Sequence, residues 1–199
     1  MGIITNVISA TWPMVLVSMV IIVSIRICYL IKNHEHVVLY RELIMLSIII
    51  YTLMLFQVVT SQDVVSWSSN NFIPFKEIFR YKIGSRLFFK NVLGNLMMFV
   101  PYGFFASYTL KHDKNAKLIV FLTLLASITI ECVQLMIGRV FDVDDILLNT
   151  LGGFCGYHLY KLLRKFEDSA PSFCKSEWFL DIISVIILLC VIAVMVGVI

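Results

Sequence analysis

Long apolar runs without charged side chains constrain the fold of this chain more than any other feature. Residues 1–25 contain no charged residue, and the runs 43–62 and 91–110 contain none either. A helix needs about 20 mostly apolar residues to cross the ~30 Å hydrocarbon core of a bilayer. Of the 199 residues, 60% are hydrophobic and 15% are charged. A soluble domain has about 45–50% apolar and about 25% charged residues, so the sequence predicts an integral membrane protein.

The apolar segments predict an all-α fold, a polytopic helical membrane protein with five to six transmembrane helices. Five segments are long enough to span a bilayer: 12–31, 43–62, 91–110, 118–138 and 182–199. A sixth, 146–160, has only 15 residues, which is about 22 Å of helix at ~1.5 Å per residue. This segment is expected to be a short, protein-covered span or a re-entrant segment.

The Lys and Arg residues predict the orientation of the chain. If all six segments span, the loops 32–42, 111–117 and 161–175 share one side and carry nine Lys and Arg residues, against six on the other side. Cytoplasmic loops carry the excess of Lys and Arg. The loop 61–90 and the turn 139–145 are therefore expected to lie together on the outer face.

Polar side chains gather in or beside the apolar segments between residues 91 and 160. Ionisable groups in lipid are costly, so they mark a functional site or a polar core. Within each segment these residues are three or four positions apart, so each set shares one helix face. The candidate binding cluster is Asn91, Asn95, Glu131, Gln134, Arg139, Asp142, Asp145 and Asn149.

Each part of this cluster also has a structural interpretation. Glu131 precedes Arg139 by eight residues, which fits either an ion pair or a carboxylate that holds a proton or a cation. Capping of a helix N-terminus explains one of Asp142, Asp144 and Asp145, because acids there favour the helix dipole. Two carboxylates and an amide also fit a hard cation. No fixed ligand pattern is present, so no metal and no cofactor is predicted.

The cysteines, the net charge and the missing motifs exclude several classes of functional site. Five scattered cysteines without a Cys-x-x-Cys pair indicate neither a disulfide framework nor a zinc site, and a net charge of +3 is too small to suggest nucleic-acid binding. No nucleophile elbow or phosphate-binding loop is present, so an enzyme is not favoured. Gly152 and Gly156 form a G-x-x-x-G that predicts close helix packing. The second half of the loop 61–90 mixes aromatic and basic residues, as interfacial segments do.

Five motifs occur in a characteristic order along the chain. They are N-F-I-P-F at 71–75, N-x-x-x-N at 91–95, F-V-P-Y-G at 99–103, E-x-x-Q at 131–134 and R-x-x-D-x-x-D-x-x-x-N-x-x-G-G at 139–153. In that order and spacing the chain resembles the VanZ-like family of bacterial membrane proteins. Asp144 is an additional acid relative to the usual D-x-x-D pattern.

The resemblance implies a division of the chain into three parts. Residues 1–62 form two N-terminal transmembrane helices, 70–162 a VanZ-like domain, and 163–199 a cytoplasmic loop with a C-terminal transmembrane helix. It also implies a multi-pass protein of a Gram-positive plasma membrane. The family is named for a protein associated with low-level resistance to teicoplanin, a glycopeptide, by a route that needs no altered peptidoglycan precursor.

The expected function is that of a non-enzymatic cell-envelope modulator. Its outward-facing polar cluster would bind the headgroup of a membrane lipid or of a lipid-linked wall precursor. One alternative is a membrane-embedded enzyme that acts on such a headgroup, with Glu131 or an aspartate as general base. Another is a small proton-coupled transporter or flippase that uses Glu131 as its proton carrier. The sequence predicts neither catalytic residues nor an oligomeric state.

Overall fold

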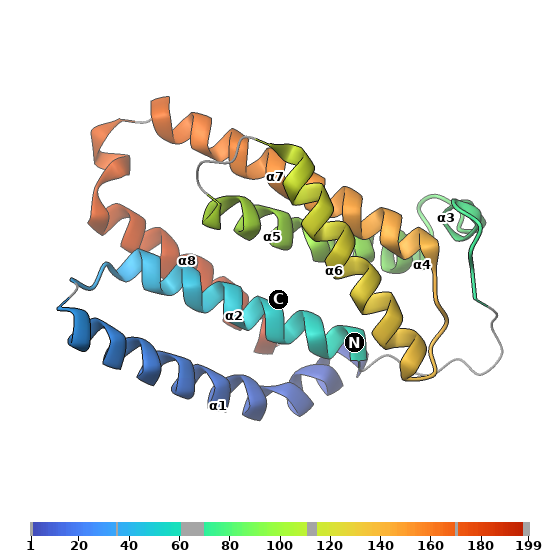
Figure 1. Ribbon diagram of the computed structural model, residues 1–199, viewed down its shortest axis with the longest axis horizontal. Helices are drawn as coiled ribbons and strands as arrows, with labels where there is room; N and C mark the ends of the chain where they lie inside the picture. The colour runs from blue at the N-terminus through green and yellow to red at the C-terminus, as the bar shows by residue number, and fades with distance from the viewer. Residues whose placement is uncertain (1, 35, 61–69, 111–114, 170, 197–199) are drawn as a thin grey trace. The chain divides into compact units, whose positions relative to one another are not determined.

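The computed structural model describes residues 2–34, 36–60, 70–110, 115–169 and 171–196 (Figure 1). Within these ranges the fold is all-α, as predicted, apart from one isolated parallel bridge between Asn71 and Asp142. The helices are α1 (Gly2–Asn33), α2 (Leu39–Thr60), α3 (Lys76–Arg80), α4 (Arg86–Phe88), α5 (Gly94–Thr109), α6 (Ala116–Met136), α7 (Val143–Ser169) and α8 (Glu177–Val196). A π-helical turn, Phe89–Leu93, precedes α5, and a 3-10 turn, Ser172–Lys175, precedes α8.

Three of the described helices are long and apolar enough to cross a bilayer: the segments Leu16–Asn33, Leu39–Val59 and Ala116–Met136. They correspond to three of the predicted spans. The other predicted spans stay predictions. The segment 91–110 is divided between the π-helical turn and α5, which has 16 residues. The segment 182–199 ends outside the described residues. The polar first part of the long loop, residues 61–69, lies wholly outside them.

The structure extends the segment 146–160 at both ends, because it is the middle of α7, a continuous helix of 27 residues. Since α7 is not among the described helices that are apolar enough to cross a bilayer, the prediction of a short span or a re-entrant segment stays a prediction. At ~1.5 Å per residue such a helix is about 40 Å long. The hydropathy of the sequence marks only the apolar part. The residues after 160 extend the helix because Lys, Leu, Arg and Glu are strong helix formers.

The contacts divide the chain into two compact units, and residues 1–61 with 169–199 form the first. In this unit α1, α2 and α8 pack around Ile50, which is 1% exposed. Polar contacts join the same helices. Arg26 Nε and Nη2 donate to the two carboxylate oxygens of Glu42 at 2.8 and 2.9 Å. The backbone N–H of Tyr40 donates to Asp181 at 2.8 Å.

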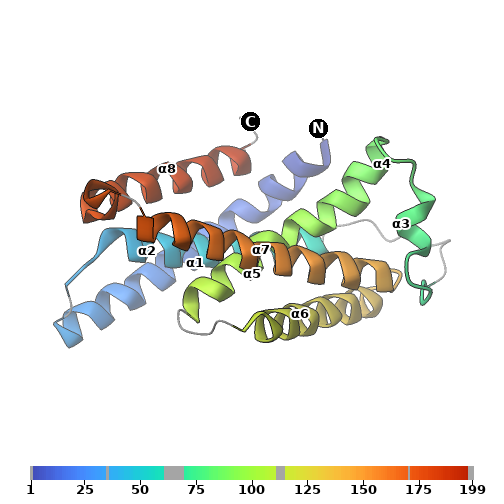
Figure 2. The ribbon, with the colours of Figure 1, turned by 90° about the horizontal axis from the view of Figure 1, so that it is seen from above.

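Residues 62–168 form the second unit, in which α5, α6 and α7 pack together (Figures 1 and 2). Glycines allow the backbones of α5 and α7 to touch. A Cβ at Gly152 would overlap the carbonyl oxygen of Leu96, and a Cβ at Gly156 would overlap that of Val100. A Cβ at Gly103 would overlap the backbone of Gly153. The packing predicted from the G-x-x-x-G is confirmed.

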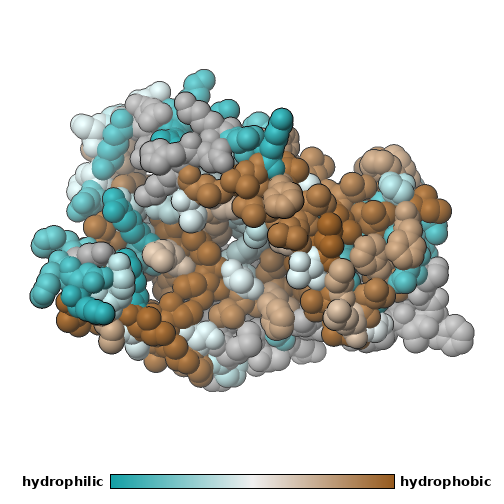
Figure 3. Space-filling view, in the orientation of Figure 1, coloured by the Kyte–Doolittle hydropathy of each residue, from teal (hydrophilic) through white to brown (hydrophobic). Residues whose placement is uncertain are grey.

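The second unit has a partly polar interior and an apolar exterior. On α6, Thr123 and Ser127 are 0% exposed, whereas Phe121 and Leu125 are 59% and 52% exposed. In Figure 3 hydrophobic residues are exposed across the middle of the visible face, and hydrophilic residues gather toward its edges. This pattern suits a helix whose outer face contacts lipid and whose polar groups are satisfied inside the protein.

Candidate functional site

The candidate site forms where α6 ends and α7 begins. Gly138, with φ +84°, adopts the left-handed conformation that ends a helix, and its N–H donates to the carbonyl of Leu135 at 3.1 Å. The chain then turns back toward α6. Glu131, which is 1% exposed on α6, accepts a hydrogen bond through Oε2 from the backbone N–H of Asp142 at 2.9 Å. The turn is therefore held by a buried carboxylate.

Glutamine 134 links Glu131 to Arg139. Oriented to satisfy both neighbours, the Gln134 amide donates to Glu131 Oε1 at 2.9 Å and accepts from the Arg139 guanidinium through its oxygen. Burial lowers the pKa of Arg139, while the charges of Glu131 and Asp145 oppose this shift. The sequence suggested pairing between Glu131 and Arg139, and the structure places a bridging amide between them.

Asp142 caps α7 and holds Asn71, which lies five residues before α3. Its Oδ1 accepts from the backbone N–H of Asp144 at 2.9 Å and from Asn71 Nδ2 at 2.8 Å. The backbone of Asn71 adds two hydrogen bonds, donating to the carbonyl of Phe141 and accepting from Val143. Burial raises the pKa of Asp142, although the hydrogen bonds from Asn71 and Asp144 oppose the shift.

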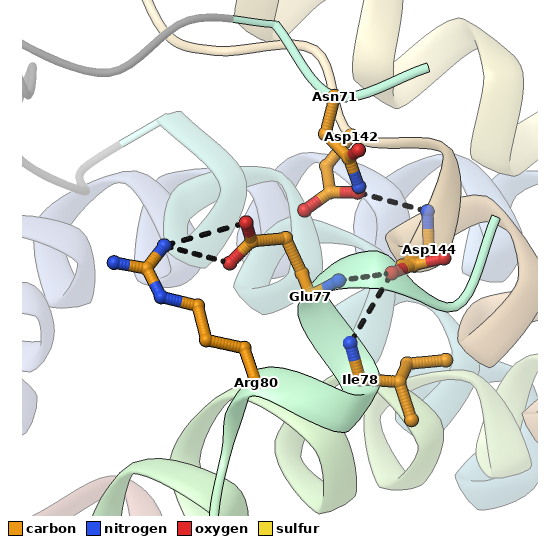
Figure 4. A network of polar contacts seen from close by, with 6 residues as sticks. All are labelled: Asn71, Glu77, Ile78, Arg80, Asp142 and Asp144. Atoms are coloured by element: carbon orange, nitrogen blue, oxygen red, sulfur yellow. Dashed lines mark hydrogen bonds and ion pairs between the residues drawn. The ribbon is translucent and has the colours of Figure 1, made fainter. Parts of the chain in front are cut away.

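Asp144 was not among the predicted site residues, yet it is central to the arrangement (Figure 4). It is 1% exposed, and its carboxylate accepts from the backbone N–H groups of Phe75, Glu77 and Ile78 at 2.5, 2.7 and 3.2 Å. These bonds fix the segment 71–78 against the start of α7. The motif N-F-I-P-F at 71–75 was the sequence signal that this segment belongs to the site.

The remaining predicted residues lie on both sides of this centre. Asn95 Nδ2 on α5 donates to Asp145 Oδ1 on the first turn of α7. One turn later Asn149 Nδ2 donates to Ser127 Oγ on α6 at 2.9 Å. Asn91 lies beside Tyr81, whose pKa is raised chiefly by burial, and the Asn91 side chain opposes that shift. Tyr81 and Ser127 were missed by the sequence analysis.

The structure thus brings seven of the eight predicted residues into contacts at the α5–α6–α7 junction, while Asn91 contacts Tyr81 beside it. The seven are Asn95, Glu131, Gln134, Arg139, Asp142, Asp145 and Asn149. We call these seven residues together with Asp144 the junction cluster. It contains four carboxylates and one guanidinium. Such a set attracts ligands that carry positive charge or hydrogen-bond donors.

In the part of the chain that the structure describes, no group of three or more His, Cys, Asp or Glu side chains is arranged to hold a metal ion. The contacts within the junction cluster are instead carboxylate–amide, carboxylate–backbone and amide–guanidinium hydrogen bonds. This arrangement offers hydrogen bonds and charge to a polar ligand.

The fold and the junction cluster define an α-helical membrane protein with a polar site inside a three-helix unit. The VanZ/LLP1 family matches residues 42–164, and the chain belongs to this family. The match begins within α2, earlier than the 70–162 domain expected from the motifs. The chain is 33% identical over 79 residues to Protein VanZ of Enterococcus faecium, which covers 39% of this chain and 48% of that protein. The chain thus spans about half the length of this relative. No solved structure matches the chain.

Proposed function

We propose that this chain is a cell-envelope protein of the plasma membrane whose junction cluster binds the headgroup of a lipid or of a lipid-linked wall precursor. The proposed consequence is lower susceptibility to teicoplanin. The observation that carries the proposal is the concentration of four carboxylates and one guanidinium at one helix junction, beside apolar, lipid-suited helix faces. Charged groups placed there at such cost favour a functional site.

The position of the cluster supports a headgroup as the ligand. It lies at the ends of helices, where α6 stops and α7 starts, and not midway along them. The segment 71–78 is bonded to the same place. A ligand bound here would have its polar part at the helix ends and its acyl part along exposed apolar side chains such as Leu135 and Met136. That division of polar and apolar contacts fits a membrane lipid.

The orientation of the cluster supports contact with the envelope. The Lys and Arg distribution favours the outer face of the plasma membrane for the turn 139–145. There the cluster would meet lipid headgroups, wall precursors and the drug itself. A protein that holds headgroups or precursors at this surface would reduce the binding or the action of teicoplanin without altering the precursor.

The test is expression in a teicoplanin-sensitive Gram-positive host. The strains carry the wild type, Glu131→Gln, Asp145→Asn and the matched control Thr129→Val. Thr129 lies two residues from Glu131 on the exposed face of α6 and bonds only its own helix, through the carbonyl of Leu125. We expect the wild type and the control to raise the inhibitory concentration of teicoplanin. The two carboxylate variants should lose this effect when compared at matched amounts of protein in the membrane.

Two results would contradict the proposal. One is full resistance in both carboxylate variants, which would make the acids structural. The other is a wild type that leaves teicoplanin susceptibility unchanged although it reaches the membrane. The envelope lipid composition of the same strains is a second measurement, and it distinguishes binding from enzymatic activity. A lipid-modifying enzyme would change the lipid composition in the wild type but not in the carboxylate variants, whereas a binding protein would leave it unchanged in all strains.

A further inference from the structure

One buried polar atom in the second unit has no hydrogen-bond partner. Asn149 is 4% exposed, and its Nδ2 donates to Ser127, but its Oδ1 is the one buried side-chain atom without a partner among the described residues. Leaving a buried acceptor unpaired costs about 1–3 kcal/mol, and native proteins rarely do so without a water or a ligand to complete the bonding.

The residue that carries this atom shares its helix face with one of the junction carboxylates. Asn149 is one helical turn after Asp145 on α7, and Ser127 is one turn before Glu131 on α6. Because residues four apart share a helix face, the Asn149–Ser127 bond and the two carboxylates line the same seam between α6 and α7. The unpaired oxygen is therefore the inner end of the acidic site.

The acceptors at this inner end outnumber the donors. Asn95 donates to one oxygen of Asp145, and among the described residues no donor contacts the other. Glu131 receives one bond on each oxygen, although each carboxylate oxygen can accept two. A water molecule would satisfy the Asn149 oxygen but would not balance the charge of the carboxylates.

We infer that the carboxylates of Asp145 and Glu131 and the amide oxygen of Asn149 form a subsite for the primary ammonium group of a phospholipid headgroup. This inference rests on the proposed function and names the class of ligand. An ammonium group offers three N–H donors and one positive charge, which match three acceptors and an excess of negative charge. Arg139, at the outer end of the cluster, would contact the phosphate of the same headgroup.

The first test compares headgroups on the wild-type protein. The purified full-length chain is titrated in detergent micelles with phosphatidylethanolamine, phosphatidylcholine and phosphatidylglycerol that have identical acyl chains. Phosphatidylcholine keeps the positive charge but has no N–H donor. We expect phosphatidylethanolamine to bind about tenfold more tightly than the other two, the effect of losing one charge-assisted hydrogen bond. Equal binding of all three lipids would overturn the subsite and leave the proposed headgroup function standing.

Binding of none of the three, by contrast, would count against both the subsite and the lipid form of the proposed function. Soluble phosphoethanolamine is included to identify the source of the amine. If it binds as tightly as the lipid, the ammonium subsite stands but its ligand is a soluble amine, which overturns the phospholipid assignment.

The second test uses Asn149→Leu, which replaces the amide by an apolar side chain of similar size. We expect this variant to lose its preference for phosphatidylethanolamine over phosphatidylcholine while still binding both. Thr150→Val is the matched control, because Thr150 is the next residue on α7 and bonds the carbonyl of Ile146 in its own helix. A variant at Asn149 that keeps the full preference would overturn the subsite. If this variant does not fold, the comparison of headgroups on the wild type still decides.

Discussion

Glu131 on α6 accepts a hydrogen bond from the backbone N–H of Asp142, 2.9 Å away, and so joins the end of one helix to the residue that caps the next. The same carboxylate receives the amide of Gln134, which in turn accepts from Arg139. In the series Glu131–Gln134–Arg139 the charges fix the direction of each hydrogen bond. The Gln134 amide donates its N–H to the acid, so its oxygen must face the cation. The stability of this turn therefore depends on the order of the three side chains as well as on their presence.

This order predicts that Glu131→Gln will destabilise the protein more than the loss of a charge alone suggests. A glutamine at 131 must present its oxygen to the N–H of Asp142, so its NH2 group faces the NH2 group of Gln134. If Gln134 turns to accept, its donor then faces Arg139. One mismatched pair remains in either orientation, and we expect a loss of about 1–3 kcal/mol in unfolding free energy, measured by denaturant unfolding in detergent.

The control for this prediction is the exchanged double variant, Glu131→Gln with Gln134→Glu. It keeps the total charge and restores the donor–acceptor order, because a carboxylate at 134 can accept from both Arg139 and the amide at 131. We expect it to recover most of the lost stability. A double variant less stable than Glu131→Gln alone would show that the hydrogen-bond order is not what stabilises the turn.

A second prediction concerns Asp144, whose carboxylate accepts from three backbone N–H groups of the segment 75–78. Asp144→Ala should release this segment from α7. Loss of even one of these three charge-assisted bonds, about 1.5–3 kcal/mol, would raise the population of the open form by about 10- to 100-fold, so the variant should show at least this increase. We expect trypsin to cut after Lys82 and Arg86 correspondingly faster.

Glu77→Gln is the matched control, since it removes only the surface ion pair with Arg80, and such pairs contribute little. Its cleavage rate should stay close to that of the wild type. If Asp144→Ala is cut no faster than this control, the segment 71–78 is held by other contacts.

The role of Asp144 also marks the limit of what the sequence predicts. Spacing of three and four residues grouped Asp142, Asp145 and Asn149 on one helix face. In the structure Asp145 and Asn149 lie within α7, whereas Asp142 precedes the helix and caps it. The partners of Asp144 are 66 to 69 residues earlier in the chain, and helix spacing carries no information about them. From the sequence Asp144 was only a candidate helix cap and an additional acid, and nothing in the spacing linked it to the segment 71–78.

The same reasoning explains the other differences. Apolar length predicted α2 and α6 closely, since burial in lipid determines both. It missed the full extent of α7, because hydropathy does not register a helix that continues with charged residues. The position of Gln134 between Glu131 and Arg139 could not be predicted from the sequence either. Spacing places Gln134 and Glu131 on one face but does not give the path of the turn that returns Arg139 to them.

A third prediction uses the glycines between α5 and α7. Gly156→Ala should destabilise the protein strongly, because its methyl group would overlap the backbone of Val100 and Phe104. Overpacking of this kind typically costs about 1–3 kcal/mol or more. Gly94→Ala is the matched control, since a Cβ there would meet only the Phe89 carbonyl oxygen at 3.7 Å, an ordinary contact.

The control variant should be neutral or more stable, by up to about 1 kcal/mol, because alanine restricts the unfolded chain. Thermal unfolding of the two variants in the same detergent checks the pair. Equal effects at both positions would mean that α5 and α7 do not touch through Gly156.

A fourth prediction concerns pH. Burial is the main cause that raises the pKa of Asp142 in the folded protein, and the charges of Asp144 and Glu77 add to it. The folded state therefore keeps a proton that the unfolded chain, with a pKa of about 3.9, has already lost. The stability that this proton contributes is fully present below the unfolded pKa and is lost as pH rises through the folded pKa.

Asp142→Asn removes this titration but keeps an oxygen to accept from Asn71 and Asp144. We expect the unfolding temperature of the wild type to fall, relative to that of the variant, as the pH is raised from about 4. A difference between the two proteins that does not change with pH would contradict the raised pKa of Asp142.

The final prediction concerns the orientation of the junction cluster. The segment 71–78 is bonded to Asp142 and Asp144, so the loop that follows it lies on the same side of the membrane as the cluster. With the five native cysteines replaced by serine, Lys82→Cys should react with an impermeant maleimide in intact cells, because residue 82 is exposed and the cluster is expected outside. Lys165→Cys, near the other end of α7, should react only after permeabilisation.

The reverse pattern would place the cluster in the cytoplasm and remove its access to wall precursors on the outer face. Labelling of both positions in intact cells would show that α7 does not cross the membrane, although it is long enough to do so.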